Sequence, residues 1–213
     1  MSTKKILIHA SFKPIKQKLT YCVQRNRKQP RYGLKPRGLW YAPGRAWLDW
    51  CIKEDYYAHK YKYFYVVVPM YTTLDKPNVN RILKINNEDE FDLFNFKYGF
   101  STKKNNIDDF IMVRWDDVAK DFGGIEIIPL IETRLYLQFS KIINPDADIL
   151  IKKYRKYGFN VNEITMFWLD ALDVPSGCIW NPKAIKKFYQ IKKKLKCVNG
   201  VNNKELTLQR IHF

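Results

Sequence analysis

The chain has 213 residues, and 46% of them are hydrophobic, which is enough apolar material for the core of one domain of ordinary size. No stretch approaches the roughly 20 consecutive apolar residues that a membrane-spanning helix needs. The apolar run Ile6-Leu7-Ile8 near the N-terminus is too short for a secretory signal. Composition therefore argues against a membrane or secreted protein, and we expect a single intracellular domain.

Positive charge is concentrated near both ends of the sequence. The formal net charge is +17. Residues 1–48 contain twelve Lys or Arg and no acid, residues 183–213 contain nine Lys or Arg and one acid, and the part between them is slightly acidic. A positive field attracts polyanions, of which nucleic acid is the commonest inside cells. We therefore predict that basic residues near the two ends bind nucleic acid, namely Arg25, Arg27, Lys28, Arg31, Lys192, Lys193 and Lys194.

In the first half of the chain, runs of apolar and β-branched residues predict strands, and helical spacing of apolar residues predicts helices. Strands are expected over residues 4–11, 38–42, 63–70 and 81–85, and helices near 15–25 and over 45–54 and 87–98. Within the helix over 45–54, Trp47, Trp50 and Cys51 lie on one face. That face is predicted to lie in the hydrophobic core.

The second half of the chain has shorter predicted elements. Helices are expected over residues 115–120, 152–157 and 165–172, strands over 125–129 and 135–139, and a loop over 173–177. Residues 182–196 are predicted as a final helix, because Pro182 suits a first helical turn and the segment carries a dense face of lysines. Helices and strands do not alternate regularly, which indicates an α+β fold. Residues 1–181 are expected to form its core, and residues 182–213 a basic C-terminal helix and tail.

Several sequence motifs of common chemistries are absent. Gly33 and Gly38 have the spacing of a phosphate-binding loop, but Leu39 and Trp40 follow where Lys and Ser or Thr are needed. The sequence contains no GxGxxG, GxSxG, HExxH or CxxC pattern. The four cysteines and three histidines are scattered, so we predict free thiols and no metal site.

Three polar residues occur within or beside predicted strands. His9 interrupts an apolar first strand, Tyr41 ends the strand before a Pro-Gly turn, and Glu126 lies inside the apolar run Ile125-Glu126-Ile127-Ile128. A buried carboxylate needs a partner or a function, because an unpaired buried charge is costly. Each residue also has a purely structural interpretation: a hydrogen-bonded core histidine, a packing tyrosine, and a carboxylate that faces water from an edge strand.

The order His9, Tyr41, Glu126 along successive strands resembles the ADP-ribosyltransferase superfamily, in particular its His-Tyr-Glu branch. The resemblance extends over about residues 4–130, through ILIHAS, KPRGLWYAPGRAWLDW, YFYVVVP and IDDFIMVRWDDVAKDFGGIEIIP. It implies a split antiparallel β-sheet core with flanking helices and NAD as co-substrate. It also implies roles for the three side chains. Glu126 would stabilise positive charge on the reacting ribose, Tyr41 would stack on the nicotinamide ring, and His9 would hydrogen-bond the other ribose.

With the basic ends of the chain, this resemblance predicts an NAD-dependent ADP-ribosyl transferase that acts on an anionic acceptor, such as DNA or RNA. A different class of function is a non-catalytic nucleic-acid-binding protein that uses basic arms for phosphates and exposed aromatic rings for bases. A third is a metal-dependent nuclease with Asp121 and Glu126 as its acids, although Ile127-Ile128 follows where such a site has x-Lys. The pattern does not indicate an oligomeric state.

Overall fold

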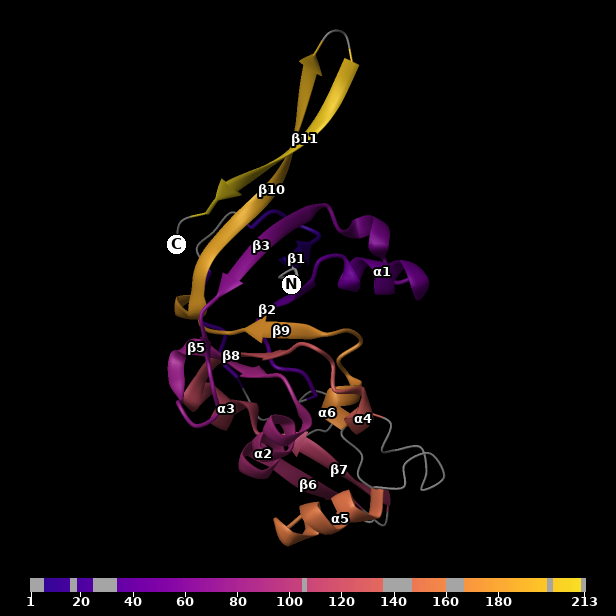
Figure 1. The fold of residues 1–213 in the computed structure, drawn as a ribbon, viewed down its shortest axis with the longest axis vertical. Coiled ribbons are helices and arrows are strands. Elements are labelled where there is room, and N and C mark those ends of the chain that lie inside the picture. Colours follow the sequence, from indigo (N-terminus) through magenta and orange to yellow (C-terminus); the bar gives the residue numbers. More distant parts are fainter. Residues whose placement is uncertain are drawn as a thin grey trace.

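The computed structural model describes residues 6–15, 19–24, 34–104, 107–135, 147–159, 167–198 and 201–211. Within these ranges nine strands form one sheet in the order β11-β10-β3-β1-β2-β9-β8-β5-β4 (Figure 1). The strands are β1 Leu7–Ser11, β2 Leu39–Pro43, β3 Tyr63–Pro69, β4 Tyr71–Thr72, β5 Asn78–Ile85, β8 Phe122–Ile127, β9 Ser176–Ile179, β10 Ile185–Val198 and β11 Val201–Arg210. Neighbours are antiparallel from β11 to β8, and β8, β5 and β4 run parallel. A mostly antiparallel sheet with few helices agrees with the predicted α+β class.

The helices and a small hairpin lie around this sheet. Their bounds are α1 Ala46–Lys53, α2 Glu88–Tyr98, α3 Trp115–Asp121, α4 Glu132–Leu135, α5 Ala147–Lys156 and α6 Phe167–Asp170, with the 3-10 turns η2 Ala58–Lys60 and η4 Pro182–Ala184. A second, two-stranded sheet pairs β6 Gly99–Lys104 with β7 Ile107–Val113. In Figure 1, α2 to α6 and this hairpin lie in the lower half, and α1 lies beside β1 and β2. No helix in the described part of the chain has the length and apolar character needed to cross a bilayer.

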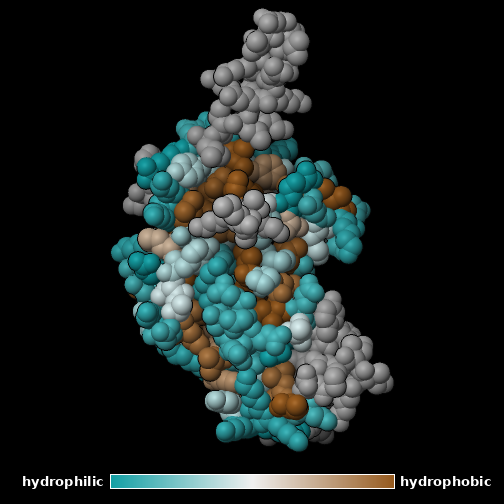
Figure 2. Space-filling model, in the orientation of Figure 1, coloured by the Kyte–Doolittle hydropathy of each residue, from teal (hydrophilic) through white to brown (hydrophobic). Residues whose placement is uncertain are grey.

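Side chains alternate between the two faces of the sheet, and each face packs a hydrophobic core. The larger core lies under the helices and contains Leu83, Ile85, Phe91, Phe94, Trp115, Ile125, Ile127, Trp168 and Trp180. The smaller core lies on the opposite face and contains Tyr41, Tyr65, Val67, Ile82, Ile179, Ile185 and Phe188. In Figure 2 hydrophobic residues show in the upper half of the body, and hydrophilic residues cover most of the lower half.

The predicted C-terminal helix over residues 182–196 is wrong. Only Pro182–Ala184 forms a helical turn, and the chain then continues as β10, which pairs with β3 and with β11. A register shift between Ile185 and Lys187 lets both Ile185 and Phe188 reach the same core. With this bulge, two core residues of a strand are three positions apart in the sequence, which resembles the spacing of a helix. Residues 185–198 and 201–210 therefore belong to the central sheet and to a ribbon that projects from it (Figure 1).

The predicted first-half elements mostly agree with the structure, with two corrections. Residues 19–24 form no helix, so the helix expected near 15–25 is wrong where the structure describes it. Trp47 and Trp50 are only half-buried, whereas Cys51 is fully buried. The two indoles stack on each other with ring centres 5.0 Å apart, at the surface of α1 and not in the core.

The predicted elements in the second half of the chain also agree with the structure in most places. The helices over 115–120, 152–157 and 165–172 and the strand over 125–129 correspond to α3, α5, α6 and β8, with shifted bounds. The expected strand over 135–139 is wrong at Leu135, which ends α4, and its other residues lie outside the described ranges. Ser176 and Gly177, expected in a loop, belong to β9.

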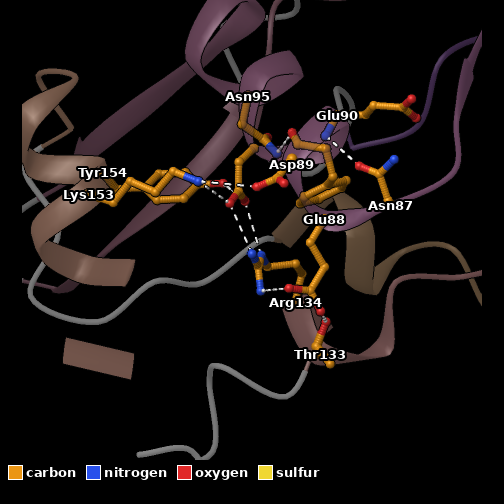
Figure 3. Close-up of polar contacts among 11 residues, drawn as sticks. Asn87, Glu88, Asp89, Glu90, Asn95, Thr133, Arg134, Lys153 and Tyr154 are labelled. Atoms are coloured by element: carbon orange, nitrogen blue, oxygen red, sulfur yellow. Dashed lines mark hydrogen bonds and ion pairs between the residues drawn. The ribbon is translucent and has the colours of Figure 1, made fainter. Parts of the chain in front are cut away.

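A buried ionic cluster joins α2 to α4 and α5 (Figure 3). The carboxylate of Asp92 is fully buried and accepts two hydrogen bonds from Arg134, at 3.0 and 2.9 Å. Lys153 and the Tyr154 hydroxyl donate to the same carboxylate at 3.0 and 2.9 Å. Arg134 also pairs with Glu88 at 3.1 Å. Because every partner is satisfied, we interpret this cluster as structural.

Candidate active site

Residues from five neighbouring strands form a row across one face of the sheet. Tyr41 of β2 is opposite Gly177 of β9, Gly177 is opposite Glu126 of β8, and Glu126 is opposite Lys84 of β5. The β1–β2 register, in which Ile8 is opposite Ala42, places His9 next to Tyr41. Side chains at paired positions share a face of the sheet. The three residues predicted from sequence therefore lie on the same face, within one row.

Glu126 is 2% exposed, so its carboxylate depends on protein partners. The hydroxyl of Tyr41 donates to Glu126 Oε2 at 2.8 Å, and the hydroxyl of Tyr71 donates to the same oxygen at 2.6 Å. Tyr71 comes from β4, at the edge of the sheet. It is a site residue that sequence reasoning missed, since it follows β3 by two residues and lies in no periodic pattern.

Gly177 makes the contact between Tyr41 and Glu126 possible. The ring of Tyr41 lies directly over Gly177, so that a Cβ atom added there would be 2.3 Å from Tyr41 Cζ. Because Gly177 is opposite both Tyr41 and Glu126, the missing side chain opens the path from one to the other. The tyrosine hydroxyl thus crosses a whole strand to reach the carboxylate.

The environment of Glu126 raises its pKa above the ordinary value of 4.5. Burial is the main cause, because it disfavours the charged form. The hydrogen bonds from Tyr71 and Tyr41 and the charge of Lys84 oppose this effect and lower the pKa. Burial and the neighbouring carboxylate raise the pKa of both tyrosines. Their hydroxyls therefore stay protonated and can act as donors to Glu126.

His9 lies where the pairing between β1 and β2 ends. The last pair of that ladder is Ile8 with Ala42, and beyond it His9 Nδ1 lies 2.6 Å from the backbone oxygen of Trp40. A carbonyl oxygen can only accept, so Nδ1 carries a proton. Burial lowers the pKa of His9, which favours the neutral ring. In that form Nε2 is left as an acceptor.

Two cavities border His9. One has a volume of about 780 Å³, and its walls include His9, Thr20, Arg37, Leu39, Ile179 and Trp180 but not Glu126. The other has a volume of about 270 Å³ and is lined by Trp40, Trp47, Tyr61, Leu172 and Asp173 among others. The larger volume falls within the range of about 300–1,000 Å³ that is usual for small-molecule sites.

The structure places the remaining predicted residues only in part. Arg25, Arg27, Lys28 and Arg31 lie outside the described ranges. Lys192, Lys193 and Lys194 belong to β10, and the side chain of Lys192 is exposed. None of the predicted basic residues that the structure describes lies in the row of Glu126.

Metal and thiol chemistry find no site in the described part of the chain. No group of three His, Cys, Asp or Glu side chains there is arranged to hold a metal ion. Asp121, the other acid of the nuclease hypothesis, bonds to Lys97 and Tyr98, whereas Glu126 bonds to Tyr41 and Tyr71. Cys178 is fully buried, and burial raises its pKa, which keeps it a thiol.

Comparisons of this chain with models of protein families, with curated proteins and with solved structures found no match. The arguments for its function therefore come from its own residues.

We predict that Gly177→Ala destabilises the fold by forcing the Tyr41 ring to move. Overpacking of a close-packed site typically costs about 1–3 kcal/mol. In a Tyr41→Ala background the added methyl group has room, and the same substitution should then be neutral or slightly stabilising, because alanine suits a strand better than glycine. Urea unfolding of the four proteins of this double-mutant cycle measures the coupling. An equal cost in both backgrounds would show that Tyr41 does not require glycine at 177.

Proposed function

We propose that the protein is an NAD-dependent ADP-ribosyl transferase whose catalytic carboxylate is Glu126, and that its acceptor is a nucleic acid. The observation that carries the proposal is the 2.8 Å hydrogen bond between Tyr41 and Glu126. These two residues are 85 positions apart in the chain, and the sequence pattern predicts both as site residues. His9, the third predicted residue, lies in the same row.

The chemistry of this transfer suits a fixed carboxylate. When the bond between nicotinamide and ribose C1′ breaks, its electron pair leaves with nicotinamide, and positive charge develops on the ribose. A buried carboxylate held by two hydroxyls stabilises such charge without reorganising. An oxygen of the acceptor then bonds to C1′ and loses its proton. Glu126, with Tyr41 and Tyr71 as its donors, would supply the electrostatic stabilisation.

His9 and the larger cavity would supply binding. The neutral ring of His9 offers Nε2 as an acceptor for a ribose hydroxyl, because Nδ1 is occupied by Trp40. The cavity of about 780 Å³ beside His9 has the volume and the mixed polar and apolar walls that suit a nucleotide. Arg37, which is among the residues that line this cavity, would offer a positive charge for a phosphate group.

Tyr41 has a clearer role as a positioning residue than as a stacking surface. Its exposed fraction is 2%, and one face of its ring is covered by Gly177. The hydroxyl fixes the Glu126 carboxylate. Stacking of the Tyr41 ring on nicotinamide stays a prediction from the resemblance to the ADP-ribosyltransferase superfamily.

The first experiment tests NAD itself. A thermal-shift titration of the whole chain with NAD should raise the melting temperature, since a ligand that binds only the folded state stabilises it. Incubation with labelled NAD and a mixture of single- and double-stranded oligonucleotides should release nicotinamide and label the nucleic acid. The absence of both a thermal shift and nicotinamide release would refute the transferase proposal.

We predict a pH dependence of turnover that reports the ionisation of Glu126. The charged form is the active one, so activity should rise with pH through a midpoint above 4.5, because burial raises the pKa. Tyr71→Phe removes a hydrogen bond that favours the charged form. Its acid limb should therefore move to still higher pH. Profiles of turnover against pH for wild type and Tyr71→Phe test this. The matched control is Tyr157→Phe, which makes the same change on an exposed ring just after α5. A shift toward lower pH in Tyr71→Phe would contradict the assigned role.

A non-catalytic nucleic-acid-binding protein is the second candidate. The observation that favours it is the group of exposed aromatic rings and lysines beside α1. The two functions are separable, because binding alone requires neither Glu126 nor NAD.

A further inference from the structure

Six aromatic side chains form a continuous cluster at the surface beside α1, which we call the aromatic platform. Its members are Phe12, Trp47, Trp50, Tyr56, Tyr57 and Tyr61. Each ring contacts at least one other, with centroid separations from 4.4 Å between Phe12 and Tyr61 to 6.3 Å between Trp47 and its tyrosine neighbours. The cluster comes from three short segments: the end of β1, helix α1, and the residues before β3.

Several of these rings remain exposed. Phe12 is 46% exposed, Tyr56 45% and Tyr57 50%. Large aromatic side chains normally bury most of their area. An exposed group of them therefore indicates a surface that another molecule covers.

The backbone beside the exposed rings is held in an unusual conformation. Asp55 and Tyr57 have φ values of 50° and 48°, in the left-handed region that residues other than glycine rarely adopt. They are the two residues with this feature, other than glycines, in the described ranges. Such strain concentrates at binding sites, where it orients a side chain. Here Tyr57 precedes the 3-10 turn η2, its side chain is 50% exposed, and Lys60 Nζ lies 3.8 Å from its ring centre.

The charges around the platform favour an anionic partner. Arg45 is paired with Asp49, and Lys53 with Glu54. Among the described residues no carboxylate lies within ion-pair distance of Lys13, Lys60 or Lys62. The other acids of this region are Asp55 and Asp173, and Asp173, which lines the smaller cavity, is paired with Lys35. The backbone N–H of Lys62 donates to the carbonyl oxygen of Ser11, two residues before Lys13.

Exposed aromatic rings next to lysines that have no carboxylate partner form the kind of surface that binds a single strand of nucleic acid. Its bases stack on aromatic faces, and its phosphates attract the lysines. A duplex keeps its bases stacked on one another and offers no free base face. We propose that the aromatic platform binds single-stranded nucleic acid through Phe12 and Tyr57. This inference rests on the proposed function in one respect: it names the acceptor as a single strand.

The platform also extends to two strands of the site. Trp47 and Tyr61 line the smaller cavity together with Trp40, and that cavity lies against β1 and β2. A strand held on the platform would therefore lie beside two of the strands that carry the candidate active site.

The test measures binding without NAD, so that its outcome is independent of the transferase proposal. A fluorescein-labelled oligothymidylate of about 15 nucleotides is titrated with the whole chain, and anisotropy gives the affinity. Because each ring offers a stacking surface for one base, Tyr57→Ala and Phe12→Ala should each weaken binding about tenfold, which corresponds to about 1.4 kcal/mol. Tyr57→Phe keeps the ring and should bind like wild type. Tyr157→Ala removes a ring of similar exposure in the turn that follows α5 and should have no effect.

Three results would overturn the proposal. One is equal affinity of the two alanine variants and the wild type, with melting temperatures that show all of them to be folded. Another is binding of a duplex of the same length as tightly as the single strand, which would indicate contacts to phosphates alone. The third is no binding of the oligonucleotide at low salt, which would leave the platform to a protein partner. None of them bears on nicotinamide release by Glu126.

Discussion

Replacing Glu126 by glutamine is expected to lower turnover of NAD about 10²-fold or more while leaving the fold intact. The loss is the size typical for one preorganised electrostatic group. Glutamine keeps the shape of the side chain and an oxygen that can accept from Tyr41 and Tyr71, which now bond to Glu126. It removes the negative charge that the reacting ribose requires. Nicotinamide release by wild type and variant at equal concentration measures the effect.

A matched control distinguishes the negative charge of Glu126 from a negative charge elsewhere on the protein. Glu54→Gln makes the same change on an exposed residue whose partner is Lys53, and it should leave turnover unchanged. If Glu126 has only a structural role, Glu126→Gln would alter the melting temperature and leave the rate of nicotinamide release as it is in wild type. That pattern would remove Glu126 from the chemistry.

The strands that carry His9, Tyr41 and Glu126 could be predicted from sequence because each is a short apolar run bounded by turn residues. Their adjacency could not. Tyr41 and Glu126 are 85 residues apart, and only the resemblance to the ADP-ribosyltransferase superfamily connected them. The row across the sheet depends on which strands pair and in which register, and no local pattern determines that.

Two residues that complete the site were missed for local reasons. Gly177 follows Asp173-Val174-Pro175-Ser176, a composition typical of a loop, yet it forms a strand because β9 is inserted between β2 and β8. Tyr71 lies in a strand of two residues, too short to produce any alternation. Both errors arise where long-range pairing overrides local preference.

The C-terminal segment shows the same effect more strongly. Its lysines and its spacing of Ile185 and Phe188 favour a helix when taken alone. The segment forms a strand because β10 pairs with β3 and Phe188 stacks on Tyr65, with 5.0 Å between ring centroids. The bulge that places Ile185 and Phe188 on the same face of the sheet depends on this long-range pairing.

Replacing Asp92 by asparagine is expected to cost about 3–5 kcal/mol of folding free energy, because it removes the buried counter-charge of Arg134 and leaves that cation only the half-exposed Glu88. Asp92 is fully buried, and the side chain of Arg134 is 11% exposed. The partners of Asp92, Arg134 and Lys153, lie 42 and 61 residues away in the sequence, so no sequence pattern could have paired them with it. Asparagine also turns an amide donor toward these donors.

The matched control for this effect is Asp117→Asn, which makes the identical change in an ion-pair group at the surface. Asp117 is paired with Arg114 and Lys120, and its side chain is 39% exposed. Exposed pairs contribute about 0–1 kcal/mol, so the loss at Asp117 should be several-fold smaller than at Asp92. Urea unfolding at neutral pH gives both values. Comparable losses at the two positions would mean that water reaches the Asp92 cluster, because only desolvation of Arg134 makes the removal of one charge at Asp92 so costly.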